Sequence, residues 1–421
     1  VGHLVAELMT PYGDVIGRGI VDLERISAGQ KQDREITGIH IVIRPVPQGL
    51  SGSVIPGEKD TEVVLVGTGV AVQTDAEGRF SIPSLSHGSN VIVRADRAGY
   101  WGSVSFAHAG ENPALELYED GTGSLANEIA GTSVRKAKGA IVFGRVTYQG
   151  KPVAGAQVDL VTAAGLKPIY FNEALKPDPS LDTTSKNGLY AFYPVNQGTH
   201  AVQVTWKNGR ALEPVIFPAE TAAVSRVDIE AIRDQTAKIK VFDAFRTDYA
   251  LPADVAFLGD HRVYTVDRSG VRRLKFAGGS GVVILEARSG TAYERTRLVL
   301  DRSRNVVYFP MVQTAWLRKI QGSLRINALP GRGTIVGFVQ GNAPYKVSLT
   351  GTDSNTKVVY FSNAGEILPS DYGEPGGGFA VFNVEEGFQT VTIQASGSIK
   401  AYSTVSLVER NVVSVISQWL R

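Results

Sequence analysis

Short stretches in which apolar and polar residues alternate recur along most of the chain. Examples are "NVIVRA", "AQVDLV", "HAVQVTW", "GVVILEA", "YKVSLTG" and "QTVTIQA". A period of two is typical of a β-strand with one buried face. Long stretches with the 3.6-residue period of a helix are scarce, and the β-branched residues of the tail "NVVSVISQWLR" favour a strand there as well. The pattern predicts an all-β protein.

A unit of turn, strand, glycine turn and strand returns several times. It is clear in "TDAEGRFSIPSLSHGSNVIVRADRAGY", "TTSKNGLYAFYPVNQGTHAVQVTW" and "EPGGGFAVFNVEEGFQTVTIQASG", and looser in "VDRSGVRRLKFAGGSGVVILEARSG". The glycine pairs of the clear copies are Gly78 and Gly88, Gly188 and Gly198, and Gly377 and Gly387. The first glycine of a pair permits a positive φ in the turn, and the second lets the chain reverse. We therefore expect one structural module for each copy.

Each copy has partner strands before it and a closing strand after it. The module is thus predicted to be an antiparallel β-sandwich of roughly seven strands, of the transthyretin or immunoglobulin kind. A length of 421 residues suits a tandem array of about four such domains. We place them at residues 1–127, 137–233, 234–325 and 326–421.

Several connecting segments carry expectations of their own. "GDVIGRGIVDLE" should be the strand that precedes the first copy, and residues 119–139 should be a polar linker. Residues 25–62 should form a long inserted loop or excursion that holds the strand "GIHIVIRPV". Residues 313–334 have no assignment. Sandwiches joined by short linkers make a stiff spacer, so we expect a rod.

The second module and the latter half of the first resemble a known family. The first half of its pattern is matched by Gly144, Val146, Gly150, Pro152, Val153, Gly155, Ala156 and Val158. The second half is matched by Asp75, Gly78 and Phe80, followed by the triplet Ala98, Gly99 and Tyr100. These motifs resemble the carboxypeptidase regulatory-like domain, and the resemblance implies a transthyretin-like sandwich. The fourth copy fits the pattern moderately and the third copy weakly.

Composition excludes several classes of protein. A formal net charge of +2 gives the chain no overall attraction for nucleic acid or anionic lipid. The absence of cysteine excludes disulfides, thiolate zinc sites and cysteine nucleophiles. No apolar run reaches the ~18 residues of a transmembrane helix. Because the chain begins at Val1 and the architecture is typical of surface proteins, we expect export after removal of a signal peptide.

Candidate chemistry is sparse. "HAGE" places His108 and Glu111 at the spacing of a zinc peptidase pair, but in a turn and without a third ligand. Ser280 lies in a glycine turn, and not in a nucleophile elbow. The acidic turns "YEDGTG" and "TGTDSNTK" lack the regular ladder of a calcium loop. We predict no catalytic residue, no metal ligand and no cofactor.

Two groups of residues are candidates for contact with a ligand or partner. Tyr100 and Trp101 are adjacent, so in a strand they point to opposite faces and one of them could offer a platform to a glycan. Residues 234–325 hold sixteen Lys and Arg against nine Asp and Glu, a net charge of +7. There Arg272, Arg273, Arg295 and Arg297 either form a solvated sheet face with cross-strand ion pairs or dock an acidic partner.

These observations predict a non-catalytic, exported scaffold, adhesin or assembly component of a bacterial surface or periplasm. It would act through contacts with protein partners, to which sandwich edges lend themselves. Two alternatives remain open, namely an array of carbohydrate-binding modules and an accessory region of a larger secreted enzyme.

Overall fold

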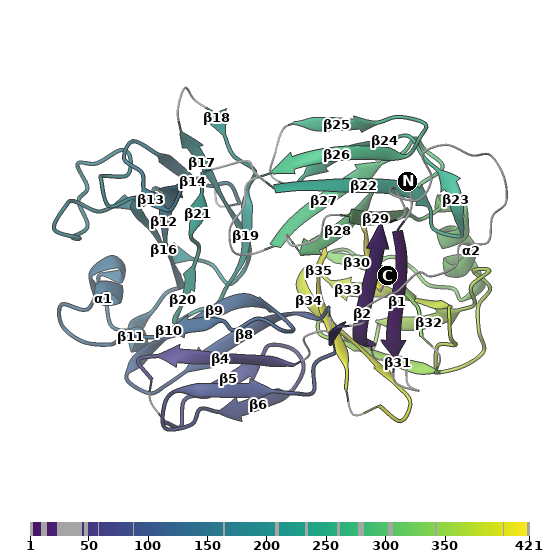
Figure 1. Cartoon of the computed structure of the whole chain (residues 1–421), viewed down its shortest axis with the longest axis horizontal. Helices are drawn as coiled ribbons and strands as arrows, with labels where there is room; N and C mark the ends of the chain where they lie inside the picture. The colour runs from purple at the N-terminus through teal and green to yellow at the C-terminus, as the bar shows by residue number, and fades with distance from the viewer. Residues whose placement is uncertain are drawn as a thin grey trace.

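The computed structural model describes residues 3–9, 15–22, 44–45, 49–57, 59–86, 88–162, 165–206, 210–231, 235–258, 262–276, 282–301, 306–341, 343–398 and 400–418. Most of these residues are in strands, which form four two-sheet sandwiches, one for each copy of the repeat (Figure 1). The predicted all-β class with tandem β-sandwich modules is confirmed. The helices of the described part are α1 (Leu125–Ala130), the 3-10 turn η2 (Val134–Lys136) and α2 (Thr314–Ser323), none long and apolar enough to cross a membrane.

The first two modules show the common plan. In module one, the first sheet contains β4 (Leu50–Ile55), β7 (Arg79–Ile82) and β10 (Ala114–Glu116), and the second sheet contains β5 (Glu62–Leu65), β6 (Val70–Gln73), β8 (Asn90–Asp96) and β9 (Tyr100–His108), with β11 (Tyr118–Glu119) beside β9. In module two, the first sheet contains β12 (Ala140–Tyr148), β13 (Lys151–Pro152), β15 (Ile169–Tyr170), β16 (Leu189–Val195), β20 (Ala223–Arg226) and β21 (Ile229–Glu230), and the second contains β14 (Gln157–Leu160), β17 (Gly198–Trp206), β18 (Arg210–Ala211) and β19 (Val215–Ala219).

The last two modules repeat this plan. In module three, the first sheet contains β22 (Gln235–Asp243), β23 (Arg246–Ala250), β26 (Val271–Phe276) and β29 (Val306–Met311), and the second contains β24 (Ala253–Phe257), β25 (Val263–Val266), β27 (Val282–Arg288) and β28 (Thr296–Asp301). In module four, the first sheet contains β30 (Arg332–Val339), β32 (Lys357–Phe361), β33 (Gly378–Glu385) and β36 (Val413–Gln418), and the second contains β31 (Tyr345–Leu349), β34 (Gly387–Ala395) and β35 (Tyr402–Val408).

The pairing is the same in every module. The first strand pairs antiparallel with the strand after the first glycine, as in β12 with β16 and β30 with β33. The closing strand returns from the second sheet and pairs in parallel with the first strand, as in β10 with β4 and β36 with β30. Each sandwich is therefore antiparallel except at its closing strand, which the sequence pattern did not indicate.

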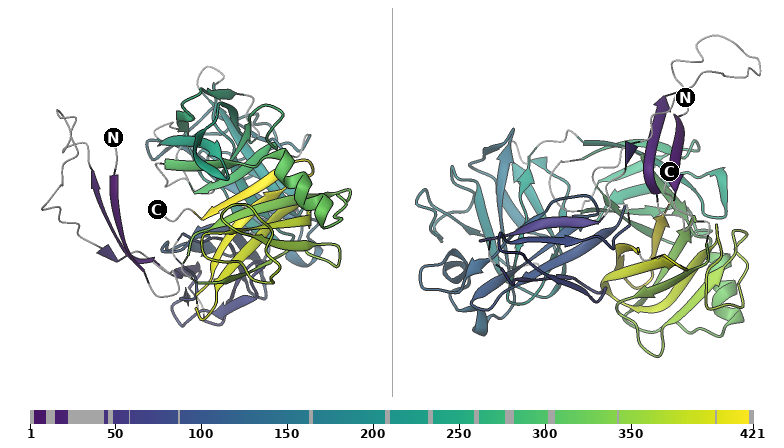
Figure 2. Two further views of the ribbon diagram at one scale, coloured as in Figure 1. Left: turned by 90° about the vertical axis from the view of Figure 1, so that its right-hand side faces the viewer. Right: turned by 60° about the horizontal axis from the view of Figure 1, so that its bottom comes forward.

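The strand that begins module one differs from the prediction. "GDVIGRGIVDLE" holds β2 (Val15–Asp22), which pairs with β1 (His3–Met9) and β3 (Arg44–Pro45) in a separate three-stranded sheet. Figure 2 shows β1 and β2 to one side of the four modules. The first strand of module one is β4, which lies inside the segment expected to be a loop. The predicted strand "GIHIVIRPV" lies almost wholly outside the described residues.

The modules are joined through their sheets. β20 of module two lies between β12 of the same module and β9 of module one, so one eleven-stranded sheet crosses both modules. β19 bridges to β27 at Ile216 and Val282, and β28 pairs in parallel with β36. A twelve-stranded sheet thereby runs through modules two, three and four. The predicted domain boundaries are not tested by these joints and stay a prediction.

The modules do not form the expected rod. Their second sheets turn their outer faces toward one apolar cluster, here called the central cluster, which contains Ile92, Val104, Phe106, Ala201, Ile216, Ala223, Val282, Ile284, Val405 and Leu407. Module four closes on module one: the backbone N–H of Ser403 donates to Ser89 Oγ (3.0 Å), and Thr390 Oγ1 donates to the carbonyl of Val66 (2.8 Å). The array folds back on itself because both faces of these strands are apolar.

Two connecting segments are packed helices. Residues 119–139 contain α1, whose Ala126 and Ile129 are buried in a cluster between modules one and two, so this segment is more than a polar linker. Residues 313–334 contain α2, whose Leu317 and Ile320 are buried in an apolar core shared by modules three and four.

Candidate interaction surface

The predicted aromatic pair is divided between two environments. Trp101 is fully buried between α1 and module two, where its Nε1 donates to Asn127 Oδ1 at 2.7 Å and its ring meets Tyr193 edge-on. Tyr100 points to the other face of β9 and packs, half-buried, against the core of module one. Trp101 therefore joins two modules and is not the exposed member of the pair, and contact of Tyr100 or Trp101 with a ligand stays a prediction.

The other described tryptophans also serve the interior. Trp206 packs against the core of module two, with its ring centroid 5.1 Å from that of Tyr148. Trp316 donates from Nε1 to the carbonyl of Gly365 and packs against Phe361 at 5.0 Å. No described tryptophan thus forms the exposed platform that the carbohydrate-binding alternative requires. Trp419 lies outside the described residues.

Arg295 and Arg297 belong to an internal ion network. Arg297 is 1% exposed, and its Nη2 contacts Glu286 Oε2 at 3.1 Å and Glu409 Oε2 at 2.6 Å. Arg295 donates two hydrogen bonds to the Glu286 carboxylate, of 2.5 and 2.7 Å. Burial alone would raise the pKa of Glu286, but the hydrogen bonds from Arg295 and Arg297 hold that pKa below its usual range. Arg297 thus ties module three to module four, and both arginines are engaged by carboxylates of the protein itself, as in the expected alternative of cross-strand ion pairs.

Arg272 and Arg273 have a different setting. Both are exposed on β26, and the strand register places Arg273 directly opposite Lys238 of β22. Lys275 is opposite Thr236, one pleat further on, and Lys240 follows Lys238 along β22. The leucine between them, Leu274, is buried in the core of module three. Lys238, Lys240, Arg273 and Lys275 therefore share the solvent side of this sheet, and we call them the basic face.

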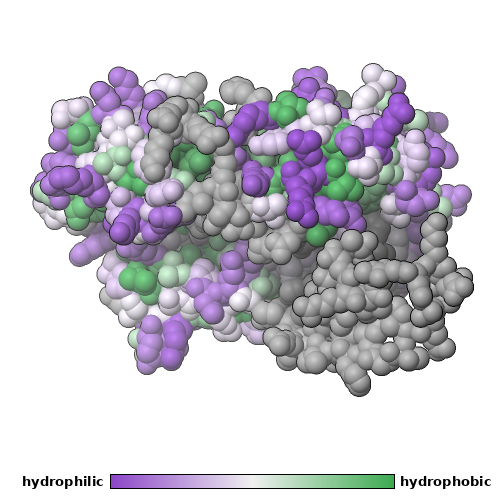
Figure 3. Space-filling view, turned by 45° about the horizontal axis from the view of Figure 1, so that its top comes forward, coloured by the Kyte–Doolittle hydropathy of each residue, from purple (hydrophilic) through white to green (hydrophobic). Residues whose placement is uncertain are grey.

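The edge of the basic face carries an aromatic ring. β29 pairs in parallel with β22, and its Tyr308 lies opposite Lys240. The Lys240 Nζ is 5.3 Å from the centre of the Tyr308 ring, a cation–π distance. In Figure 3, hydrophilic side chains are interspersed with hydrophobic ones on the described surface at the side where module three lies. Arg273 is the one member of the basic face that the sequence analysis names as a candidate; the signal for Lys238 and Lys240 was the alternation in "AKIKVF".

The glycine turns follow the repeat with one exception. Positive φ angles occur at Gly78 (74°), Gly88 (80°), Gly188 (69°), Gly198 (136°) and Gly387 (110°). In the remaining turn Gly376 takes the positive φ (76°) in place of Gly377. Gly377 is restricted instead by space, because a Cβ there would lie 2.4 Å from the carbonyl oxygen of Phe361.

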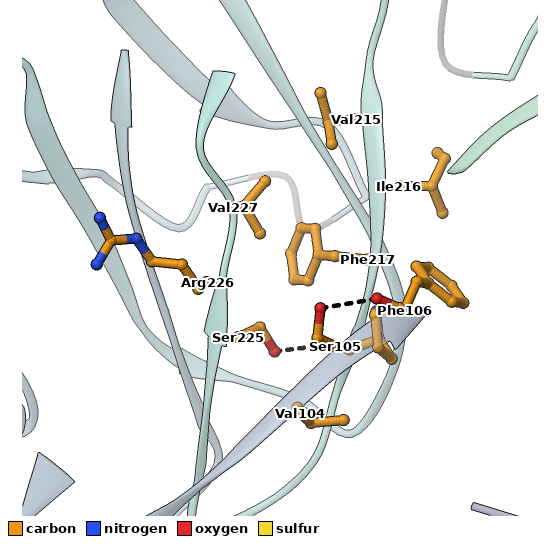
Figure 4. A pocket seen from close by; sticks show the side chains of 10 residues that line it. Val104, Ser105, Phe106, Val215, Ile216, Phe217, Ser225, Arg226 and Val227 are labelled. Carbon is orange, nitrogen blue, oxygen red and sulfur yellow. Dashed lines mark hydrogen bonds between the residues drawn. The ribbon is translucent and has the colours of Figure 1, made fainter. Parts of the chain in front are cut away.

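His108 with Glu111, and the small cavity beside β9, add no binding chemistry. Glu111 accepts a hydrogen bond from the backbone of His108, and the described residues hold no group of three His, Asp or Glu side chains that could bind a metal ion. Figure 4 shows a cavity of about 20 Å³ between β9, β19 and β20, lined by Val104, Phe106, Phe217 and Val227. That volume accommodates roughly one water molecule.

No protein-family model and no curated protein sequence matches the chain. Among solved structures, it is similar to a streptococcal ancillary pilin (10% identity, 64% of this chain, 99% of the other, TM-score 0.19) and to the Bacillus anthracis TIE protein (11%, 90%, 69%, 0.18). It is also similar to BcpA, the major pilin subunit of Bacillus cereus (10%, 66%, 98%, 0.14). Similarity this weak carries no argument about function, and the resemblance to the carboxypeptidase regulatory-like domain stays a prediction.

Proposed function

We propose that the chain is a non-catalytic, exported scaffold or assembly component of a bacterial surface or periplasm, which acts through contacts with other proteins. The observation that carries this proposal is the closed arrangement of the four modules around the central cluster. Shared sheets and a shared core make one stiff body, so the exposed faces of different modules keep fixed positions relative to one another. A body of this kind suits the presentation of binding faces.

The placement of the polar groups also supports the proposal. The buried Arg297 contacts Glu286 of module three and Glu409 of module four, and so helps to hold these two modules in place. Arg226 does the same between modules one and two, since it contacts Glu116 at 3.1 Å as well as its neighbour Asp228 at 3.0 Å. These charges stabilise the body, whereas the basic face is directed outward.

The test is the location and the associations of the full-length protein in its native cell. We expect a tagged form to be cleaved by protease added to intact cells or to spheroplasts, and to form discrete cross-linked adducts with other envelope proteins. A protein that stays in the cytoplasm, or that is purified alone after cross-linking, would contradict the proposal. Turnover of a peptide or glycan by the purified protein would contradict its non-catalytic part.

A further inference from the structure

The arginines and lysines of module three differ in whether they have a carboxylate partner. Arg246, Arg262, Arg288, Arg295 and Arg297 each lie within 4.0 Å of a carboxylate. The four side chains of the basic face are different: among the described residues, none of them has a carboxylate at ion-pair distance. Four cations of this module are therefore gathered on one sheet surface with no described carboxylate at ion-pair distance.

The register makes this arrangement unfavourable for the chain alone. Lys238 and Arg273 are directly opposite each other on neighbouring strands. Side chains in such a pair have Cβ atoms about 5 Å apart, and like charges at that position destabilise a sheet. The remaining two members of the basic face, Lys240 and Lys275, are each one pleat further along, about 6.7 Å from the nearest cation of their own strand. No ion pair with a described carboxylate offsets this repulsion.

We propose that the basic face binds an extended acidic segment of a partner protein. The inference rests on the proposed function, because it names the chemistry of one protein contact that such a scaffold would make. An extended chain in which every second residue is acidic presents its carboxylates on one side at intervals of about 6.7 Å. That interval equals the spacing of the cations along β22 and along β26. Each carboxylate can therefore meet one cation while the segment lies straight along the sheet.

Tyr308 lies at one border of the basic face. Its ring lies beside Lys240 at the β29 border and offers an apolar contact to a side chain between two acidic residues of the bound segment. The ring also keeps the ammonium group of Lys240 in place by the cation–π contact. A flat array of cations with one aromatic edge matches a strand-like ligand.

The experiment uses the purified full-length chain and two fluorescent probe peptides of identical composition. One peptide repeats Glu-Thr about six times, and the other has the same glutamates in one block followed by the threonines. Binding is measured by fluorescence anisotropy at low salt and at near-physiological salt. The test variant is the double substitution Lys238→Gln with Arg273→Gln. The control is Arg318→Gln with Lys319→Gln, which removes the same charge from exposed positions of α2.

We expect the alternating peptide to bind more tightly than the block peptide. The test variant should bind it about tenfold more weakly, because two charge contacts are lost, whereas the control should be unchanged. The test variant should also melt at the same or a higher temperature at low salt, since a like-charge pair has been removed. If it does not fold, Lys240→Gln with Lys275→Gln replaces it.

Four results would overturn the inference. The first is equal binding of the two peptides, and the second is equal loss of binding in the test and control variants; either would indicate unspecific attraction. The third is binding that occurs only after residues 1–48 are removed, which would show that the chain covers the face itself. The fourth is self-association that the test variant abolishes, which would make a second copy the occupant. Each of these outcomes is independent of where the protein resides in the cell.

Discussion

Truncation of Phe361 tests whether modules three and four share one core. Phe361 is 1% exposed on β32 of module four, yet its ring lies 5.8 Å from that of Phe245 in module three and 5.0 Å from Trp316 of α2. Replacing a buried phenylalanine by alanine costs about 3–5 kcal/mol through lost contacts and the cavity that remains. The cavity of Phe361→Ala would open at the contact between the two modules, so both should lose stability.

The size of the effect follows from the size of the unit. Residues 235–418 form the two modules, and for a unit of this length each kcal/mol lowers the melting temperature by roughly 2–4 °C. We therefore expect Phe361→Ala to lower one common transition by roughly 6–20 °C in differential scanning calorimetry. The fluorescence of Trp316, which lies against the substituted ring, should change in the same step.

Two controls define the outcome. Phe192→Ala removes an equally buried ring from the core of module two and should shift a transition that includes that module. Val358→Ala, at a site that is 40% exposed on the same strand as Phe361, should leave the melting profile nearly unchanged. If Phe361→Ala lowers the transition of module four while module three melts as before, the shared core does not exist as a cooperative unit.

Three further predictions concern the turns and the buried charges. Gly188→Ala should lower the free energy of unfolding in urea more than Gly155→Ala does. Both glycines have a positive φ, which costs alanine about 1–2 kcal/mol. Only at Gly188 would the new Cβ also meet a carbonyl oxygen, that of Val146, at 2.4 Å. Glu286→Gln should lower the free energy of unfolding by about 3–5 kcal/mol, because it removes one partner of a buried ion pair. Since the pKa of Glu286 is lowered in the fold, the wild-type chain should lose this stability as the pH falls below about 4.3, and the variant should show a smaller loss in acid titrations of unfolding free energy. Burial lowers the pKa of His200, so the free energy of unfolding should fall as the pH drops below ~6.5. The melting temperature of His200→Gln should depend less on pH over that range.

The sequence predicts the modules well because their signals are local. Alternation of side chains and two glycines ten residues apart determine a hairpin without reference to distant parts of the chain. The first strand of module one was not predicted because "LSGSVI" alternates weakly: Gly52 lies on the inner face between Leu50 and Val54, and the exposed Ile55 lies on the outer face. The stretch that forms β2 has a clearer strand pattern, so the sequence predicts that strand as the start of module one.

The arrangement of the modules had a signal that alternation alone does not reveal. β8 and β27 begin with four consecutive buried residues, and every residue of β35 is buried. Strands of this kind are covered on both faces. "NVIVRA" and "GVVILEA" therefore indicated that a second layer covers the modules, but the identity of that layer depends on contacts between distant residues. The basic face was found only in part for a related reason, since a sequence shows which residues are charged but not which of them lack a counter-charge.

The hydrogen bond between Ser89 and Ser403 joins positions that are 314 residues apart. A ribosome adds roughly 5–20 residues per second, so the first module waits on the order of tens of seconds before its neighbour in module four exists. During this interval Phe106, whose ring meets Phe388 of module four, lacks that part of its covering layer, and the uncovered part of the central cluster offers an apolar patch to any other nascent chain. Yield in a foreign host should therefore depend on the supply of holding chaperones, and slower synthesis should lower the yield by lengthening that exposure.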